Sequence, residues 1–192
     1  MALSYEKIQA MKRIKQEFDS LQNDPIENLG VTVGLINDNI FEWQCSISGP
    51  EDTSYCGGLF VLNVKFPDNY PASPPEVCFK TPIYHINVNS KASEDGKESL
   101  GHICISCLNW WNPQFKMREV LSNIFGLFYF PNVDSPYGVG LAKEFTNERA
   151  TYEEKAKYYT RKYADPRKEV IHNFEKCWDF TEFVNPNNNE DD

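Results

Sequence analysis

Between residues 31 and 80 the chain reads as a series of short strands separated by turns, and this pattern restricts the fold more than any other feature. Four segments carry it, at residues 31–36, 40–48, 59–66 and 76–80. Asn37, Asp38 and Asn39 between the first two segments are typical of a tight hairpin turn. Strands joined by turns this short pair antiparallel, because parallel neighbours need a long crossover. We therefore predict a four-stranded antiparallel meander.

Helical patterns flank this predicted sheet. The expected helices cover residues 3–22, 116–129, 139–147, 150–163 and 167–180. Ser4 can cap the start of the first helix, and Asn23, Asp24 and Pro25 end it. A helix, a sheet, a long loop and further helices, in that order, indicate an α+β domain.

Composition excludes several classes of function. The chain has 192 residues, enough for one domain, and a formal charge of -9. That charge argues against a nucleic-acid binder and against adhesion to an anionic membrane. No apolar stretch is long enough to span a membrane, and the start lacks the pattern of a signal peptide. The scattered cysteines read as free thiols, so we expect a cytoplasmic or nuclear protein.

Residues 81–115 have little periodicity and contain the only close pair of cysteines, Cys104 and Cys107. Functional residues concentrate on loops held by rigid elements, and a cysteine thiolate is a good nucleophile. Asn87 lies in the same stretch, and its amide can donate a hydrogen bond to a developing oxyanion. We therefore place the candidate site in this region.

Three interpretations of the cysteine pair remain open on spacing alone. The first is a redox pair, although the parallel βαβ pattern usual for that motif is missing. The second is a zinc site formed by Cys104, Cys107, His85 and His102, although no second metal-binding motif supports it. The third is a pair of ordinary small buried residues.

Longer motifs follow one another in a fixed order. They are Gly49-Pro50-Glu51-Asp52-Thr53-Ser54-Tyr55-Cys56-Gly57-Gly58-Leu59-Phe60, Phe66-Pro67-Asp68-Asn69-Tyr70-Pro71-Ala72-Ser73-Pro74-Pro75, Ile83-Tyr84-His85-Ile86-Asn87, Ile103-Cys104-Ile105-Ser106, Trp111-Asn112-Pro113, and Pro131-Asn132 with Ser135-Pro136. Through these motifs the chain resembles the ubiquitin-conjugating enzymes over about residues 5–163. The resemblance implies the UBC fold, with an N-terminal helix, a four-stranded meander, an active-site loop and C-terminal helices.

The resemblance also implies roles for individual residues. Cys104 would carry the modifier as a thioester, and Asn87 would support the oxyanion or brace the loop. Ser135 stands where the family places an acidic or hydroxyl residue beside the incoming lysine, with Asp134 as a weaker candidate. Two residues stay outside the catalytic set, His85 as a structural residue and Cys107 as a bystander.

The partners implied are ubiquitin or a ubiquitin-like modifier, an activating enzyme, a ubiquitin ligase and protein substrates, without nucleic acid, membrane, metal or organic cofactor. The basic residues of the first helix are Lys7, Lys12, Arg13 and Lys15. They would dock the activating enzyme, or they form an ordinary solvated face. Ala72 and Gln114 lie in the two loops that family members use to bind ligases. Two alternatives remain: a carrier for another modifier, and a non-catalytic ubiquitin-binding adaptor of the same fold.

The chain departs from the family pattern in several places. Ile86 replaces the usual Pro of the His-Pro-Asn tripeptide, which removes a fixed φ angle. Ala72 replaces the large apolar residue of many ligase-binding members. The segment 88–101 is longer than usual and contains Glu94, Asp95 and Glu98. It covers the thioester, contacts the modifier or is a solvated spacer.

The domain organisation follows from the extent of the match. Residues 1–163 form the core domain, and residues 164–184 form a helical extension. In that extension, Cys177, Trp178 and Phe180 are interpreted as packing residues. The acidic tail 185–192 is predicted to be disordered.

Overall fold

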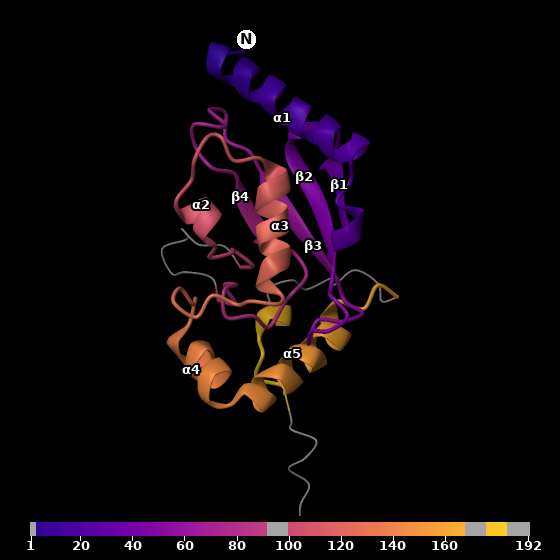
Figure 1. The fold of residues 1–192 in the computed structure, drawn as a ribbon, viewed down its shortest axis with the longest axis vertical. Helices are drawn as coiled ribbons and strands as arrows, with labels where there is room; N and C mark the ends of the chain where they lie inside the picture. Colours follow the sequence, from indigo (N-terminus) through magenta and orange to yellow (C-terminus); the bar gives the residue numbers. More distant parts are fainter. Residues whose placement is uncertain (1–2, 92–99, 168–175, 184–192) are drawn as a thin grey trace, which may run out of the picture.

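A four-stranded antiparallel sheet forms the centre of the computed structural model, which describes residues 3–91, 100–167 and 176–183 (Figure 1). Its strands are β1 (Val31–Ile36), β2 (Asn39–Ser48), β3 (Leu59–Lys65) and β4 (Glu76–Phe79). They are paired in the order β1-β2-β3-β4, so the predicted meander is confirmed. Asn37 and Asp38 have φ angles of 51° and 58°, as a tight hairpin of this length requires.

The helices surround this sheet. They are α1 (Tyr5–Asn23), α2 (Ser106–Asn109), α3 (Met117–Leu127), α4 (Val139–Asn147) and α5 (Arg149–Tyr163), with 3₁₀ turns η1 (Glu27–Leu29) and η2 (Lys176–Trp178). Figure 1 shows α1 at one end of the molecule, α3 beside the strands, and α4 and α5 at the opposite end. The predicted α+β layout is therefore confirmed. Among the described residues, no helix combines the length and the apolar character needed to cross a membrane.

The start of α1 and the face that it buries follow from its sequence. The Ser4 hydroxyl accepts a hydrogen bond from the Lys7 backbone N–H at 3.2 Å, which caps the first turn. Ala10, Ile14 and Leu21 form the buried face. Met11, although apolar, is exposed.

A single core joins the sheet to α3. Its fully buried members include Trp43, Phe60 and Leu62 from the strands and Met117, Leu121 and Ile124 from α3. Burying six side chains of this size gives the sheet and α3 a rigid packed interface. On either side of the candidate site, Ile86 and Ile103 are fully buried in this same core, so the described residues near Cys104 are anchored to it.

The structure corrects the prediction of a helix over residues 167–180. In the part that is described, residues 176–178 form one 3₁₀ turn and residues 179–183 have no regular secondary structure. Here the Phe180 ring packs against Tyr84 and Tyr159, with ring centroids 5.2 and 4.6 Å away. Residues 168–175, residues 92–99 with Glu94, Asp95 and Glu98, and the tail 185–192 lie outside the described residues.

Candidate functional site

Cys104 lies on a short extended segment that is held by hydrogen bonds on one side. The segment begins at Gly101, whose φ is +79° and whose Cα lies so close to Phe79 that a side chain would collide with the Phe79 carbonyl. The Cys104 backbone N–H donates to the Asn87 carbonyl at 2.8 Å. Ile103 and Ile105 on either side of Cys104 are buried, while Cys104 itself is half-buried. Alternation along an extended segment therefore turns the Cys104 thiol outward.

Two polar side chains contact the Cys104 sulfur. The Ser135 hydroxyl lies 3.0 Å from Sγ, and the Asn109 side-chain amide donates to Sγ at 3.4 Å. The structure thus brings together Cys104 and Ser135, which were predicted from the sequence. Asn109 was not predicted, because its contact depends on α2, a helix of 4 residues that is too short to show a period.

Asn87 is fully buried, and every polar atom of its side chain is engaged. Its Nδ2 donates to the Asn132 carbonyl at 2.8 Å and to the Ser135 carbonyl at 3.0 Å. Its Oδ1 accepts the Asn132 backbone N–H at 2.8 Å. Through these contacts Asn87 braces the loop 131–136, which is one of the two roles expected for it. Asp134 is exposed on the same loop.

His85 is buried and packs against the same region. Its Nε2 lies 3.0 Å from the Leu127 carbonyl, and its Nδ1 accepts the Asn87 backbone N–H at 3.0 Å. These partners require the neutral tautomer with hydrogen on Nε2, because a carbonyl only accepts and a backbone N–H only donates. Burial lowers the pKa of His85 to about 4.

Ile86 makes contacts that the usual Pro could not make in full. Its side chain is fully buried, and its backbone N–H donates to the Tyr152 hydroxyl at 3.3 Å. Its carbonyl accepts the Tyr137 backbone N–H at 2.8 Å. Because Pro has no N–H, the first of these bonds depends on the departure from the family pattern. Ile86 is thereby tied to α5 and to the segment that follows α3.

The zinc-site interpretation of the cysteine pair is wrong for the arrangement observed. His85 is bonded to backbone groups, and His102 Nδ1 is hydrogen-bonded to the Tyr137 hydroxyl. Within the described ranges, no group of three or more His, Cys, Asp or Glu side chains is placed to hold a metal ion. Cys107 is half-buried, and burial raises the pKa of its thiol.

An open groove of about 380 Å³ runs from Cys104 to α3. Its lining includes Cys104, Ser106, Asn123, Gly126 and Phe130. The Phe130 side chain is 81% exposed at the border of the groove, so an apolar surface adjoins the thiol.

The basic residues of α1 do not form one free docking face. Lys7 pairs with Asp68 at 2.9 Å and Lys15 with Asp19 at 2.9 Å, and Lys12 is exposed. Arg13 is only partly exposed and reaches inward. It contacts the Glu17 carboxylate at 2.5 Å and the Phe115 carbonyl at 3.1 Å, so it joins α1 to the segment before α3.

The two loops predicted to bind ligases are neighbours in the structure. Ala72 and Gln114 are both exposed, one on each loop. Between them, the Trp111 indole N–H donates to the Pro71 carbonyl at 2.7 Å. This bond fixes the two loops relative to each other, so they form one surface.

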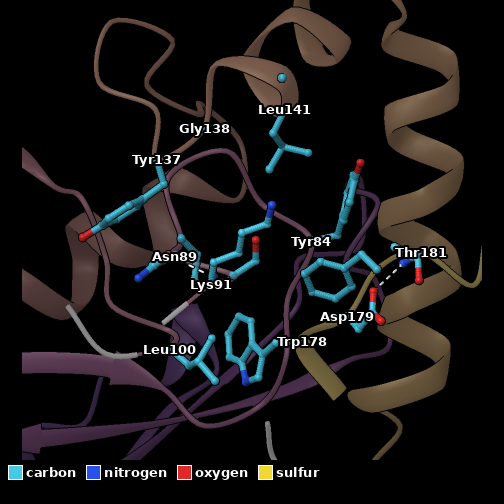
Figure 2. Close-up of a pocket in the computed structure, with 14 residues that line it drawn as sticks. Tyr84, Asn89, Lys91, Leu100, Tyr137, Gly138, Leu141, Trp178, Asp179 and Thr181 are labelled. Carbon is cyan, nitrogen blue, oxygen red and sulfur yellow. Dashed lines mark hydrogen bonds between the residues drawn. The ribbon is translucent and has the colours of Figure 1, made fainter. Parts of the chain in front are cut away.

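A larger cavity of about 790 Å³ lies beside the C-terminal segment (Figure 2). Figure 2 shows Trp178, Tyr84 and Leu141 around this space. Cys104 does not line it. It was not predicted from the sequence, because its walls come from segments far apart in the chain.

Comparison with known families gives a match over most of the chain. The family model described as ubiquitin-conjugating enzyme matches residues 13–160 of the chain. The match begins within α1 and ends within α5, so it includes the whole sheet together with Cys104, Asn87 and Ser135. The order of an N-terminal helix, a four-stranded antiparallel sheet and C-terminal helices is the UBC layout expected from the sequence.

Proposed function

The chain belongs to the ubiquitin-conjugating enzyme family, and from this membership we propose that Cys104 accepts ubiquitin from an activating enzyme as a thioester and transfers it to a substrate lysine, usually together with a ubiquitin ligase. The observation that carries the proposal is the outward-facing Cys104 thiol, which has Ser135 at 3.0 Å and an open groove beside it. A non-catalytic adaptor has no need of this combination.

The chemistry comprises two acyl transfers. In loading, the Cys104 thiolate attacks the thioester carbonyl on the activating enzyme, and that enzyme's cysteine leaves as a thiolate. In discharge, a lysine amine attacks the carbonyl carbon held on Cys104. Since the thioester is already activated, the protein needs only to position the amine and to stabilise charge. Ser135 Oγ lies near enough to the sulfur to accept a hydrogen bond from the attacking amine.

The groove gives the modifier a place to lie. A thioester on Cys104 places the modifier's last residues next to the groove, whose border includes the exposed Phe130 ring. Contacts there limit the freedom of the thioester before the amine arrives.

In this proposal two surfaces of the protein contact its partner enzymes. Exposed Lys12, with Lys7 and Lys15 released from their surface ion pairs, serves the activating enzyme, because such pairs contribute little to stability. The joined loops with Ala72 and Gln114 serve the ligase. Free thiols at all described cysteine positions support a cytoplasmic or nuclear location.

A charging reaction tests the proposal. Wild type, Cys104→Ser and Cys107→Ser are incubated with activating enzyme, ATP and ubiquitin, and run on a non-reducing gel. We expect a dithiothreitol-sensitive adduct in wild type and in Cys107→Ser, and a dithiothreitol-resistant oxyester or no adduct in Cys104→Ser. A thiol-sensitive adduct that requires Cys107 instead would contradict the assignment.

The same reaction distinguishes the alternatives. An adduct formed only with another modifier and its own activating enzyme would make the chain a carrier for that modifier. No adduct with any modifier, together with retained ubiquitin binding, would establish the adaptor.

A further inference from the structure

We propose that the side-chain amide of Asn109, and not that of Asn87, donates the hydrogen bond that stabilises the oxyanion when an amine attacks the thioester on Cys104. This inference rests on the proposed function. It makes Asn109 a catalytic residue, because its amide contacts the reacting sulfur, and it makes Asn87 a positioning residue.

The hydrogen-bond count at Asn87 is the first argument. A side-chain amide has two N–H hydrogens, and those of Asn87 are directed at the Asn132 and Ser135 carbonyls, at 2.8 and 3.0 Å. The side chain is fully buried. Turning one hydrogen toward Cys104 would leave a partly buried carbonyl without its partner, which costs on the order of 1 kcal/mol.

The position of Asn109 is the second argument. Its Nδ2 lies 3.4 Å from Cys104 Sγ, while its own backbone N–H donates to the Ile105 carbonyl at 3.0 Å. The backbone at Asn109 is therefore fixed by α2, and the side chain is exposed and free to rotate. Within the described part of the chain, the Asn109 amide has no acceptor other than the Cys104 sulfur.

The geometry suits the charge that develops. In the thioester the carbonyl carbon is bonded to Sγ, and its oxygen lies two bonds from the sulfur. A donor already at 3.4 Å from Sγ reaches that oxygen by rotating its side chain, without movement of the backbone. Ser135 approaches the same sulfur through a hydroxyl, which is left to accept a hydrogen bond from the amine.

The step balances as follows. The amine nitrogen forms a bond to the carbonyl carbon, and the π electrons move to the carbonyl oxygen as the oxyanion. The amide N–H of Asn109 stabilises this charge. The oxyanion then reforms the carbonyl, the carbon–sulfur bond breaks, and Cys104 leaves as a thiolate. The amine loses its proton to solvent, which leaves the amide product.

A single-turnover discharge experiment tests the inference. Charged protein is freed of activating enzyme and ATP, mixed with free lysine at several concentrations, and followed by the loss of the thioester. For Asn109→Ala we expect the maximum rate to fall about tenfold or more, because removal of one oxyanion donor typically costs about 100-fold or more in an enclosed site and less in an exposed one. The lysine concentration for half-maximal rate should stay unchanged, since the amide does not contact the amine.

Matched variants separate this role from a structural one. Asn147→Ala removes another exposed Asn, at the end of α4, and should discharge like wild type. Asn109→Ala should keep the wild-type melting temperature. Asn87→Ala should lower the melting temperature, because it leaves the Asn132 and Ser135 backbone groups unpaired.

The outcomes are distinguishable. If Asn109→Ala charges normally and discharges at the wild-type rate, the role of Asn109 is refuted while the proposed function stands. If Asn87→Ala discharges slowly but keeps its melting temperature, and Asn109→Ala discharges at the wild-type rate, the oxyanion donor is Asn87. Failure of wild type to charge with any modifier overturns the proposed function and this inference with it.

Discussion

At the scale of single residues, the site depends on buried polar side chains whose donors and acceptors are all engaged in hydrogen bonds. His85 is the clearest case, because its Nδ1 already accepts the Asn87 N–H and its Nε2 is bonded to the Leu127 carbonyl. A proton added at Nδ1 would meet a donor instead of an acceptor. The imidazolium would also lose its hydration, which is why burial lowers the pKa of His85 to about 4.

The pKa of His85 predicts a loss of stability in mild acid. The unfolded chain binds a proton at His85 near pH 6.5, whereas the folded chain binds it only near pH 4. The unfolded state therefore binds more protons in that window, and stability falls as the pH falls from about 6.5 to 4. The full loss is about 3 kcal/mol, measured as the urea unfolding free energy at successive pH values.

His85→Gln provides the comparison for that series. We expect the variant to have a lower unfolding free energy than wild type at pH 7. Its unfolding free energy should vary less with pH, because it keeps all carboxylates and lacks the imidazole. The difference between the two proteins should therefore shrink as the solution is acidified. A constant difference from pH 7 to pH 4.5 would show that His85 does not titrate as described.

Sequence reasoning reached some of these residues and not others. Cys104, Asn87 and Ser135 were predicted through family motifs, and the structure brings them together. The Ile86 substitution was visible, but its hydrogen bond to Tyr152 was not, because 66 residues separate the partners. Asn109 belongs to none of the family motifs, and only the short helix α2 brings it to the sulfur.

At the scale of elements, Glu17 joins three parts of the fold. It is a buried residue of α1, and its carboxylate accepts hydrogen bonds from Arg13 at 2.5 Å, the Tyr70 hydroxyl at 2.8 Å and the Met117 backbone N–H at 2.6 Å. Met117 begins α3, and Tyr70 belongs to the loop that precedes β4. Burial and the Glu17 carboxylate raise the pKa of Tyr70 well above its ordinary value, so its hydroxyl remains a donor.

We predict that Glu17→Ala lowers the unfolding free energy by about 3 kcal/mol, because it leaves a buried hydroxyl and a helix N–H without an acceptor. Urea denaturation at neutral pH measures this loss. Asp19→Ala breaks the exposed Lys15 pair on the same helix and should cost under about 0.5 kcal/mol. Equal effects of the two substitutions would contradict the role assigned to Glu17.

The elements themselves were largely predictable. All four strands begin and end within about one residue of their predicted bounds, because alternation and turn residues mark them locally. The helix expected at 167–180 was wrong in its described part. There, the Phe180 ring is placed by contacts with Tyr84 and Tyr159, which are distant in the chain, and not by a helical period.

At the scale of the whole molecule, the C-terminal segment closes the end of the domain opposite α1. Trp178 is 3% exposed, and Phe180 contacts both Tyr84 and Tyr159. Tyr84 precedes His85, so the C-terminal segment packs against the chain that leads into the site. Trp178 and Phe180 therefore belong to the folded core, although the family match ends at residue 160.

Trp178→Ala tests this view of the extension. Removing a buried indole typically costs about 3–5 kcal/mol, so we expect a marked fall in melting temperature. Thr181→Ala, an exposed change in the same segment, should leave the melting temperature within about a degree or two. An unchanged melting temperature for Trp178→Ala would mean that the extension is not part of the cooperative unit.

The central claim is that the sulfur of Cys104 carries the modifier as a thioester. The intact mass of the charged protein tests this claim most directly. Wild type incubated with activating enzyme, ATP and ubiquitin should gain the mass of one ubiquitin less one water, and dithiothreitol should remove that mass. After digestion without reductant, the linked peptide should contain Cys104. A linked peptide joined through Cys107 or through a lysine, with Cys104 left unmodified, would contradict the account.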